Sequence, residues 1–315
     1  MRGITVPTVQ AGNAIGVDLG GTKILAGVVA RDGSVVRRHE RPTPQDSQEH
    51  VLAELEGAVA ELLDDSVAAV GFGTPSPIDQ ARGVVVRCVN LPLEDAPVRD
   101  RMHGRFGIPV GLENDANAAA IGEWQAGAGR GEDDLVMLTL GTGVGGGVIS
   151  GGKPFRGRNG GGAEFGHVVV VHDGRPCQGV CTGRGHLEAY VSGTAVTAAA
   201  QETFGPSADA HRLVRLANEG DAAAKDLLEE VGRYLGSGIG SFANVFAPQL
   251  VVLGGGFGVA AFDYLGGPAE GVALREALEP MRSAVRLAKA ELGTAAGLIG
   301  AAFVGFEALD AAAQS

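Results

Sequence analysis

The chain has few cysteines, few basic residues and no long apolar run, and each shortage excludes a class of protein. Three cysteines in 315 residues are no disulfide framework, so we expect a cytoplasmic protein. There are 25 basic side chains against 37 acidic ones, a formal net charge of −12. Binding to a DNA or RNA backbone relies on clustered Lys and Arg, so we expect no nucleic-acid partner.

Long apolar segments and targeting signals are also missing. The longest uncharged, mostly apolar stretch runs from Leu292 to Phe306, shorter than the ~18 residues of a membrane span. It predicts a buried helix rich in small residues, and no membrane partner. The first thirteen residues lack the pattern of a secretory signal and are interpreted as a loose tail.

Glycine, by contrast, is abundant, with 52 residues that cluster at expected turns. Two glycine-rich turns, at Asp18–Lys23 and Leu140–Gly147, have similar sequences, and each lies between two apolar runs that predict strands. Glycine there permits a positive φ and brings backbone N–H groups close to an anion. Two such turns facing each other would hold a polyphosphate, which favours a nucleotide bound between two related lobes.

Strands alternate with helices along the chain, which predicts an α/β fold with an internal duplication. A length of 315 residues suits two domains. Strands are expected at residues 15–18, 24–30, 35–41, 67–72, 109–112, 135–140, 148–149, 250–253 and 284–287. Helices are expected from residue 47, at 97–106, from 114 to 124, within 188–246 and at the C-terminal end.

The first glycine turn has the groups of a phosphate site. Asp18 ends a strand, where its carboxylate could hold Mg²⁺, and Lys23 could add positive charge. Gly20, Gly21 and Thr22 would supply backbone N–H groups. The turn matches neither a Walker loop nor a dinucleotide-binding loop, and an ordinary tight hairpin explains it about equally well.

A second candidate is the junction between a strand and an Ala-rich helix at Glu113–Asn117. A carboxylate held there could accept a hydroxyl proton during phosphoryl transfer. Asn and Asp also cap helices routinely, and taken alone the motif favours that structural role.

In combination the motifs resemble the ROK family (repressors, open reading frames and sugar kinases), and within it the bacterial ATP-dependent glucokinases. The matching segments follow the family's order from about Ala14 to the end: 18–23, 113–120 with 122–123, 140–147, Glu164 with 166–167, Gly185 with 187–188, and 254–256. The resemblance implies a two-lobed, actin-like ATPase (ribonuclease H-like) α/β fold with an interlobe active-site cleft. Residues 1–118, rejoined by a C-terminal helix at about 298–315, would form one lobe, and 119–297 the other, which carries the zinc loop and part of the nucleotide site.

The resemblance also implies an activity and its residues. ATP with Mg²⁺ would phosphorylate the 6-hydroxyl of glucose, and Asp115 would be the general base. The sugar would further contact Asn90, Asn114, Glu164, His167 and Glu188. ATP and its metal would be bound by Asp18, Gly20, Gly21, Thr22, Lys23, Thr142, Gly143, Gly254 and Gly255. Simpler interpretations stay open for Asn90, as a turn residue, and for Glu188, as an exposed helix acid.

The cysteine segment departs from the family pattern of one His followed by Cys-x-Cys-Gly-x-x-Gly-Cys. Cys177 lies two places upstream of the family's first Cys, and His186 replaces the last one. His167, Cys177, Cys181 and His186 still form a Cys₂His₂ set suited to structural Zn²⁺, with His172 in reserve. Reduced thiols in a loop are the alternative, and Cys88 is expected to be a core residue.

Other members of the family leave the substrate open among fructose, allose, N-acetylmannosamine and N-acetylglucosamine. Ser76 and Ala163 replace glycines usual in the family, which puts the sugar's identity in doubt. Three other interpretations are less favoured. A polyphosphate donor is disfavoured because segments 20–23 and 254–256 resemble the ATP-dependent members of the family. A sugar-sensing regulator would need a helix-turn-helix domain, for which the seventeen residues before Asp18 are too few, and the sugar-site motif counts against an ATPase-driven assembly protein. The resemblance suggests a homodimer or a dimer of dimers.

Overall fold

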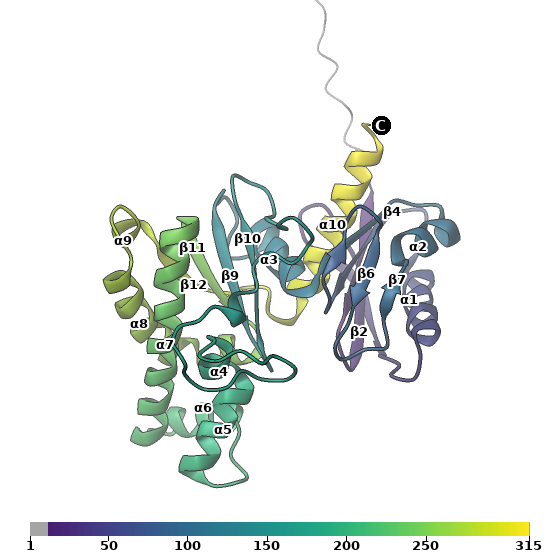
Figure 1. The fold of residues 1–315 in the computed structure, drawn as a ribbon. Coiled ribbons are helices and arrows are strands. Elements are labelled where there is room, and N and C mark those ends of the chain that lie inside the picture. Colours follow the sequence, from purple (N-terminus) through teal and green to yellow (C-terminus); the bar gives the residue numbers. More distant parts are fainter. Residues whose placement is uncertain (1–11, 315) are drawn as a thin grey trace, which may run out of the picture. The chain divides into compact units, whose positions relative to one another are not determined.

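The computed structural model describes residues 12–314, and the chain divides into two compact units (Figure 1). Unit 1 comprises the chain up to Ala118 together with Gly297 onward, and unit 2 comprises Ala119–Ala296. Of the expected N-terminal tail, residues 1–11 lie outside the described residues.

Unit 1 is built on a five-stranded sheet in the order β3-β2-β1-β4-β8. The strands β1, β2 and β3 pair antiparallel, whereas β4 and β8 extend the sheet in parallel from β1. Their bounds are Asn13–Leu19, Lys23–Val29, Val35–Pro42, Val67–Thr74 and Val110–Asn114. The central strands are apolar and buried, as parallel strands covered on both faces are.

Helices cover this sheet. Helix α1 (Gln48–Leu62) begins at Ser47, whose hydroxyl accepts the N–H of His50, and it buries the apolar face that its spacing predicts. Helix α2 (Val98–Phe106) precedes β8, and α3 (Asp115–Ala126) follows it directly. A small sheet is formed by β5 (Ile78–Asp79), β6 (Val84–Arg87) and β7 (Glu94–Ala96), and strands of two to four residues give no clear alternation in the sequence.

The C-terminal helix α10 (Ala296–Ala312) packs against the sheet of unit 1. A Cβ added to Gly16, Gly71 or Gly111, on three neighbouring strands, would collide with the backbone of this helix. The expectation that the segment is too short to span a membrane was wrong: Gly293–Ala312 is long and apolar enough by length and composition, because the helix continues beyond Phe306. However, 61% of its most apolar window is buried inside the protein, as in a core helix.

Unit 2 repeats the strand plan of unit 1. Its sheet has the order β10-β9-β11-β12, with β9 (Leu135–Leu140) and β10 (Val144–Ile149) as a hairpin. Parallel β11 (Leu250–Gly254) and β12 (Arg286–Lys289) extend it, as β4 and β8 extend the first hairpin. The expected duplication is therefore present in the topology. The last strand lies two residues later than predicted, because the short helix α9 (Met281–Ala284) occupies that segment.

The helices of unit 2 pack beside its sheet. Helices α4 (Glu188–Val191), α5 (Gly193–Phe204), α6 (Ala210–Asn218) and α7 (Ala222–Phe246) lie in the region predicted to be helical. Helix α8 (Gly256–Glu276) was not predicted, since its glycines and an internal proline obscure the helical pattern. Helices α7 and α8 run side by side (Figure 1), and the smallness of Gly232 and Gly236 lets their backbones approach closely.

Candidate functional site

The carboxyl ends of β1, β4 and β8 gather acidic side chains at one edge of the unit 1 sheet. Asp18 pairs in register with Gly73, and Gly73 pairs with Glu113. A Cβ built on Gly73 would lie 3.7 Å from the Cα of Asp115 and 4.0 Å from Oδ1 of Asp18. The carboxyl edge of parallel strands is where open α/β sheets bind ligands, so the register brings the two candidate aspartates together.

Asp18 is held in a confined position. It is half-buried, and a Cβ added to Gly297 would lie 2.5 Å from its Oδ2. Burial, and then the negative charge of Asp115, raise the pKa of Asp18 to about 6, while Lys23 opposes the rise. Two carboxylates in such a site can hold a divalent cation, because the cation relieves their repulsion.

At the junction between β8 and α3, Asn114 and not Asp115 is the residue that caps the helix. Its Oδ1 accepts the N–H groups of Ala116 at 3.0 Å and Asn117 at 3.1 Å, as an N-cap side chain does. Its Nδ2 donates to Oδ1 of Asp115 at 3.0 Å, and the same oxygen accepts the N–H of Ala116 at 2.8 Å. Asp115 is thus oriented by its neighbour at the first turn of α3.

The first glycine turn closes the β1–β2 hairpin and is supported from the segment after β3. The N–H of Gly20 donates to the carbonyl of Lys23 at 2.9 Å, and Thr43 donates through Oγ1 to the carbonyl of Gly20 at 2.8 Å. The space beside Gly21 is open. Lys23 is exposed and forms an ion pair with Glu40 at 2.9 Å, which the sequence did not indicate.

The expectation of positive φ in the two turns was wrong. None of Gly20, Gly21, Gly141 and Gly143 has a positive φ. These glycines close antiparallel hairpins without that conformation. Because they have no side chain, and because Gly21 and Gly141 border open space, a ligand can approach the backbone there.

The second turn is fixed by Glu188 at the start of α4. Oε2 of Glu188 accepts the N–H of Val144 at 2.8 Å, and a Cβ on Gly143 would lie 2.5 Å from that oxygen. Helix α5 also holds the turn: the N–H of Gly193 donates to the carbonyl of Gly141 at 2.7 Å, and Thr194 donates to that of Thr142 at 2.8 Å.

A cavity of about 250 Å³ opens beside this turn within unit 2. It is lined by Gly141, Thr142, Gly193, Thr194, Ala210, His211, Gly256 and Phe257. Three helices, α5, α6 and α8, begin at this cavity. Side chains cap the first two, but α8, whose N-cap residue is Gly255, has no side-chain cap. Its N–H groups and the helix dipole can therefore receive an anion such as a phosphate.

The sequence analysis did not identify five residues of this cavity: Gly193, Thr194, Ala210, His211 and Phe257. Helix starts were a usable signal for the first four only, since α8 was not predicted; Gly256 belongs to the expected segment 254–256. At Gly254 and Gly255, the side on which a side chain would stand is filled by the protein. A Cβ on Gly254 would collide with Met137, and one on Gly255, whose φ is +77°, with the backbone of Leu140. Both glycines allow the β11–α8 turn to pack on β9.

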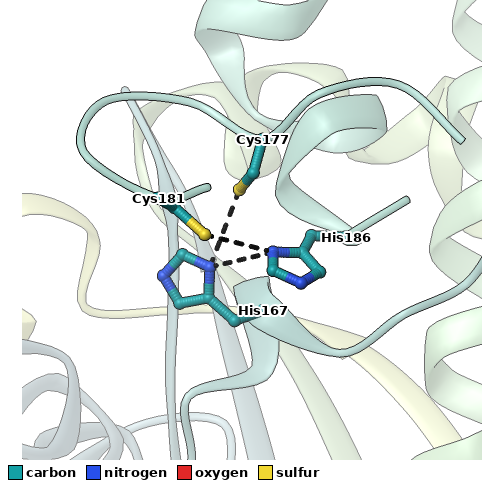
Figure 2. Close-up of side chains that lie close together, drawn as sticks. All are labelled: His167, Cys177, Cys181 and His186. Atoms are coloured by element: carbon teal, nitrogen blue, oxygen red, sulfur yellow. Dashed lines mark hydrogen bonds between the residues drawn. The ribbon is translucent and has the colours of Figure 1, made fainter. Parts of the chain in front are cut away.

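Four side chains converge in the loop region before α4 (Figure 2). One potential ligand atom from each of His167, Cys177, Cys181 and His186 lies within 4.8 Å of every other. Sγ of Cys177 is 3.7 Å from Nδ1 of His167, and Sγ of Cys181 is 3.5 Å from Nδ1 of His186. Cys177, which lies two places upstream of the family's first Cys, and His186, which replaces the family's last Cys, thus lie close to His167 and Cys181. His172 lies outside this group.

The Cys/His group is linked to the second glycine turn. Burial is the main cause that raises the pKa of the Cys177 thiol to about 11, and Cys181 and Glu188 raise it further. Sγ of Cys177 lies 3.9 Å from Oε1 of Glu188, whose other oxygen accepts the N–H of Val144. Gln178 donates to the carbonyl of Glu188 at 3.0 Å and to Ser192.

The remaining candidate sugar contacts lie on loops. Glu164 and His167 are exposed, at the start and the end of the 3₁₀ turn η1 (Phe165–His167). Asn90 is exposed in the loop between β6 and β7. Ala163 has a φ of +65°, so the alanine that replaces the family's glycine occupies a left-handed conformation. Cys88 is buried, as expected.

Comparison with known proteins agrees with the motifs. The ROK family model matches residues 14–306. A glucokinase of Thermotoga maritima is 36% identical over 307 residues, 92% of this chain and 96% of the relative. An N-acetylmannosamine kinase of Escherichia coli is 33% identical over 291 residues, 92% and 97% of the two chains. The crystal structure of a Streptomyces griseus ROK family glucokinase in complex with glucose and AMPPNP has a TM-score of 0.80 and 36% identity, covering 94% of this chain and 100% of that one.

These matches agree in the fold as well as in the motifs. The strand duplication and the two glycine turns are those of the two-lobed, actin-like sugar kinase fold. The chain belongs to the ROK family.

Proposed function

We propose that the protein is an ATP-dependent hexose kinase that transfers the γ-phosphoryl group to the 6-hydroxyl of glucose, with Asp115 as the general base. The observation that carries this proposal is the Asn114–Asp115 junction. Asn114 takes the helix cap and directs one oxygen of Asp115, which lies beside Asp18 at the carboxyl edge of the sheet. Family membership and the glucokinase relatives support the sugar kinase class, a phosphotransferase with an alcohol acceptor.

Phosphoryl transfer asks the protein for positioning and for charge neutralisation. In the proposed reaction the sugar oxygen forms a bond to the γ-phosphorus as its proton passes to Asp115, and the bond from the γ-phosphorus to the bridging oxygen of ADP breaks. Asp18 suits a Mg²⁺ ion, because a cation favours the ionised form of this carboxyl, whose pKa is raised. When bound, Mg²⁺ would neutralise charge on the phosphates.

The nucleotide is assigned to the two glycine turns and the cavity of unit 2. Gly21 and Thr22 would supply backbone N–H groups and Lys23 positive charge, whereas the N–H of Gly20 is already donated to the carbonyl of Lys23, so Gly20 would contribute through its lack of bulk. Thr142, Gly143 and the uncapped start of α8 would present backbone N–H groups from unit 2. The cavity of about 250 Å³ also includes His211 and Phe257, polar and aromatic walls suited to a nucleoside.

Glucose is the proposed acceptor, contacted by Asn90, Asn114, Glu164, His167 and Glu188. In this structure Glu188 also holds Val144, and Asn114 also holds Asp115, so both have positioning roles besides any sugar contact. N-acetylmannosamine is the second candidate, because the relative in Escherichia coli is similar over nearly the same length. Fructose, allose and N-acetylglucosamine complete the panel.

The donor set of the Cys/His group fits structural Zn²⁺. Two thiols and two imidazoles, with their ligand atoms within 4.8 Å of one another, match a tetrahedral Cys₂His₂ site. We propose that His167, Cys177, Cys181 and His186 hold this metal. When bound it would cross-link the loop before α4 and favour the thiolate form of both cysteines.

The test is sugar-dependent ADP release, measured with each hexose and N-acetylhexosamine, with ATP or polyphosphate as donor. Release that depends on glucose and ATP supports the proposal. Release indifferent to sugar would point to an ATPase, and sugar binding with no release would point to a sensing protein. We also propose a cytoplasmic homodimer, and sedimentation of the purified protein tests the assembly.

A further inference from the structure

A buried carboxylate, that of Glu123, lies near both places where the chain passes between the two units. The chain leaves unit 1 after Ala118, inside α3, and returns to it after Ala296, at the start of α10. Glu123 lies one turn beyond the first crossing and is fully buried, with 0% of it exposed. The proposed reaction gives it no role.

Glu123 joins the two crossing segments through backbone hydrogen bonds. Its Oε1 accepts the N–H of Leu292 at 2.8 Å, and its Oε2 accepts those of Glu291 at 3.1 Å and Ala128 at 2.9 Å. The first two donors immediately precede the second crossing, and the third follows the end of α3. A single carboxylate therefore ties the end of one crossing helix to the segment that leads into the other.

The fit around this carboxylate is tight. A Cβ added to Gly127 would collide with Oε2 of Glu123 and lie 2.9 Å from Cγ of Leu292. A buried carboxylate is costly unless its hydrogen bonds are made. The three hydrogen bonds therefore favour one relative position of the end of α3 and the segment 291–292 over nearby positions.

Helix α3 connects this site to the proposed chemistry. Asp115 lies in its first turn and Glu123 two turns later, so ~12 Å of one continuous helix joins the two residues. The neighbouring Trp124, the single tryptophan of the chain, donates through Nε1 to the carbonyl of Glu132 at 2.7 Å. Its fluorescence is therefore a native reporter on this end of the helix.

We propose that Glu123 is a positioning residue for phosphoryl transfer: it fixes the unit 2 ends of both crossing segments together, and through α3 it fixes the direction of Asp115. This inference rests on the proposed function, because it takes Asp115 as the base. A misplacement of about 1 Å at a reacting group can lower the rate by ~10²-fold, so even a small shift of α3 is measurable.

The test compares Glu123→Gln with Asp134→Asn as a matched control. The amide keeps the shape of the carboxylate but offers one acceptor oxygen, so at least one of the three N–H groups loses its partner. Asp134 also accepts a backbone N–H, that of Gly151 at 2.9 Å, but it lies outside both crossing segments. Each variant is assayed for kcat, for KM of sugar and ATP, for sugar affinity by calorimetry, for the Trp124 response to sugar, and for unfolding in urea.

We expect Glu123→Gln to lower kcat by about 10-fold or more while both KM values and the sugar affinity stay within about twofold. The Trp124 response to sugar should change in amplitude, and Asp134→Asn should leave kcat and this response near those of the wild type. If Glu123→Gln fails to fold, Gly127→Ala, whose methyl group displaces the same carboxylate, takes its place with the same expectation.

Wild-type kcat in the variant, or a loss equal to that of the control at equal stability, overturns the inference. Asp115→Asn separates this outcome from a failure of the proposed function. If Asp115→Asn keeps its turnover, the base assignment is wrong and the inference falls with it. If Asp115→Asn is inactive while Glu123→Gln keeps the wild-type kcat, only the positioning role is refuted.

Discussion

The raised pKa of Asp18 predicts that this carboxylate lowers the stability of the ligand-free protein. The pKa rises from the ordinary 3.8 to about 6, first through burial and then through the charge of Asp115. A raised pKa means that the folded protein binds the proton more tightly than the unfolded chain does. The contribution of Asp18 to the free energy of unfolding is therefore most favourable when this group is protonated, and this contribution falls as the pH rises from about 4 through 6.

The magnitude follows from the size of the shift. A difference of about two pKa units corresponds to about 3 kcal/mol once both states are ionised, at ~1.4 kcal/mol per unit. The penalty should be roughly 1.5 kcal/mol at pH 5 and about 3 kcal/mol at pH 8. Asp18→Asn removes the titrating group, so its free energy of unfolding relative to the wild type should rise by about 1.5 kcal/mol across this range.

Urea unfolding of both proteins at intervals between pH 5 and pH 8 measures this difference, and effects of the amide that do not depend on pH cancel. Asp115→Asn provides an internal check, because it removes one cause of the raised pKa and should flatten the wild-type profile. MgATP should also shrink the difference, because a cation favours the ionised carboxyl. A difference between Asp18→Asn and wild type that stays constant, or widens toward acid pH, would refute the reasoning.

Three further outcomes are expected. Asp115→Asn should lower kcat by ~10²-fold or more with sugar binding still measurable by calorimetry, and retention of most activity would remove its role as base. Elemental analysis of freshly purified protein should find zinc. Removal of the zinc by a chelator should weaken sugar affinity and lower the protease resistance of the loop 168–185. Protein isolated without zinc would contradict the site. Ala163→Gly should raise stability by about 1 kcal/mol, seen as ~2 °C in thermal unfolding, because a left-handed φ strains alanine, and an unchanged or lower Tm would contradict this.

Much of unit 1 could be predicted from the sequence, because its central strands β1, β2 and β4 are apolar and its first helix has a clear apolar face. The hairpins around both glycine turns were also predictable, since each turn separates two apolar runs. Helix α8 was not, because propensity counts against its glycines and its internal Pro268, while packing on α7 requires small residues there.

Some residues of the candidate site could likewise be predicted from the sequence, whereas their contacts could not. Residue types and order identified the aspartates, the turns and the four Cys/His residues, because their chemistry is local to short motifs. Partners from distant segments could not be inferred: Val144 bound by Glu188, Glu40 paired with Lys23, and the cavity formed where three helices begin. Which of Asn114 and Asp115 caps α3 also required the geometry, because both residue types can do so.

The discontinuity of unit 1 has a consequence for the order in which the protein is made. Glycines of its sheet form the surface on which α10 packs, so the first 118 residues cannot complete their core until the final segment has been synthesised. Unit 2 is continuous in the chain and can fold on the ribosome while the earlier strands still wait. Loss of the last helix would leave that glycine surface open to self-association, although every proposed ligand of the nucleotide and the sugar would remain in the chain.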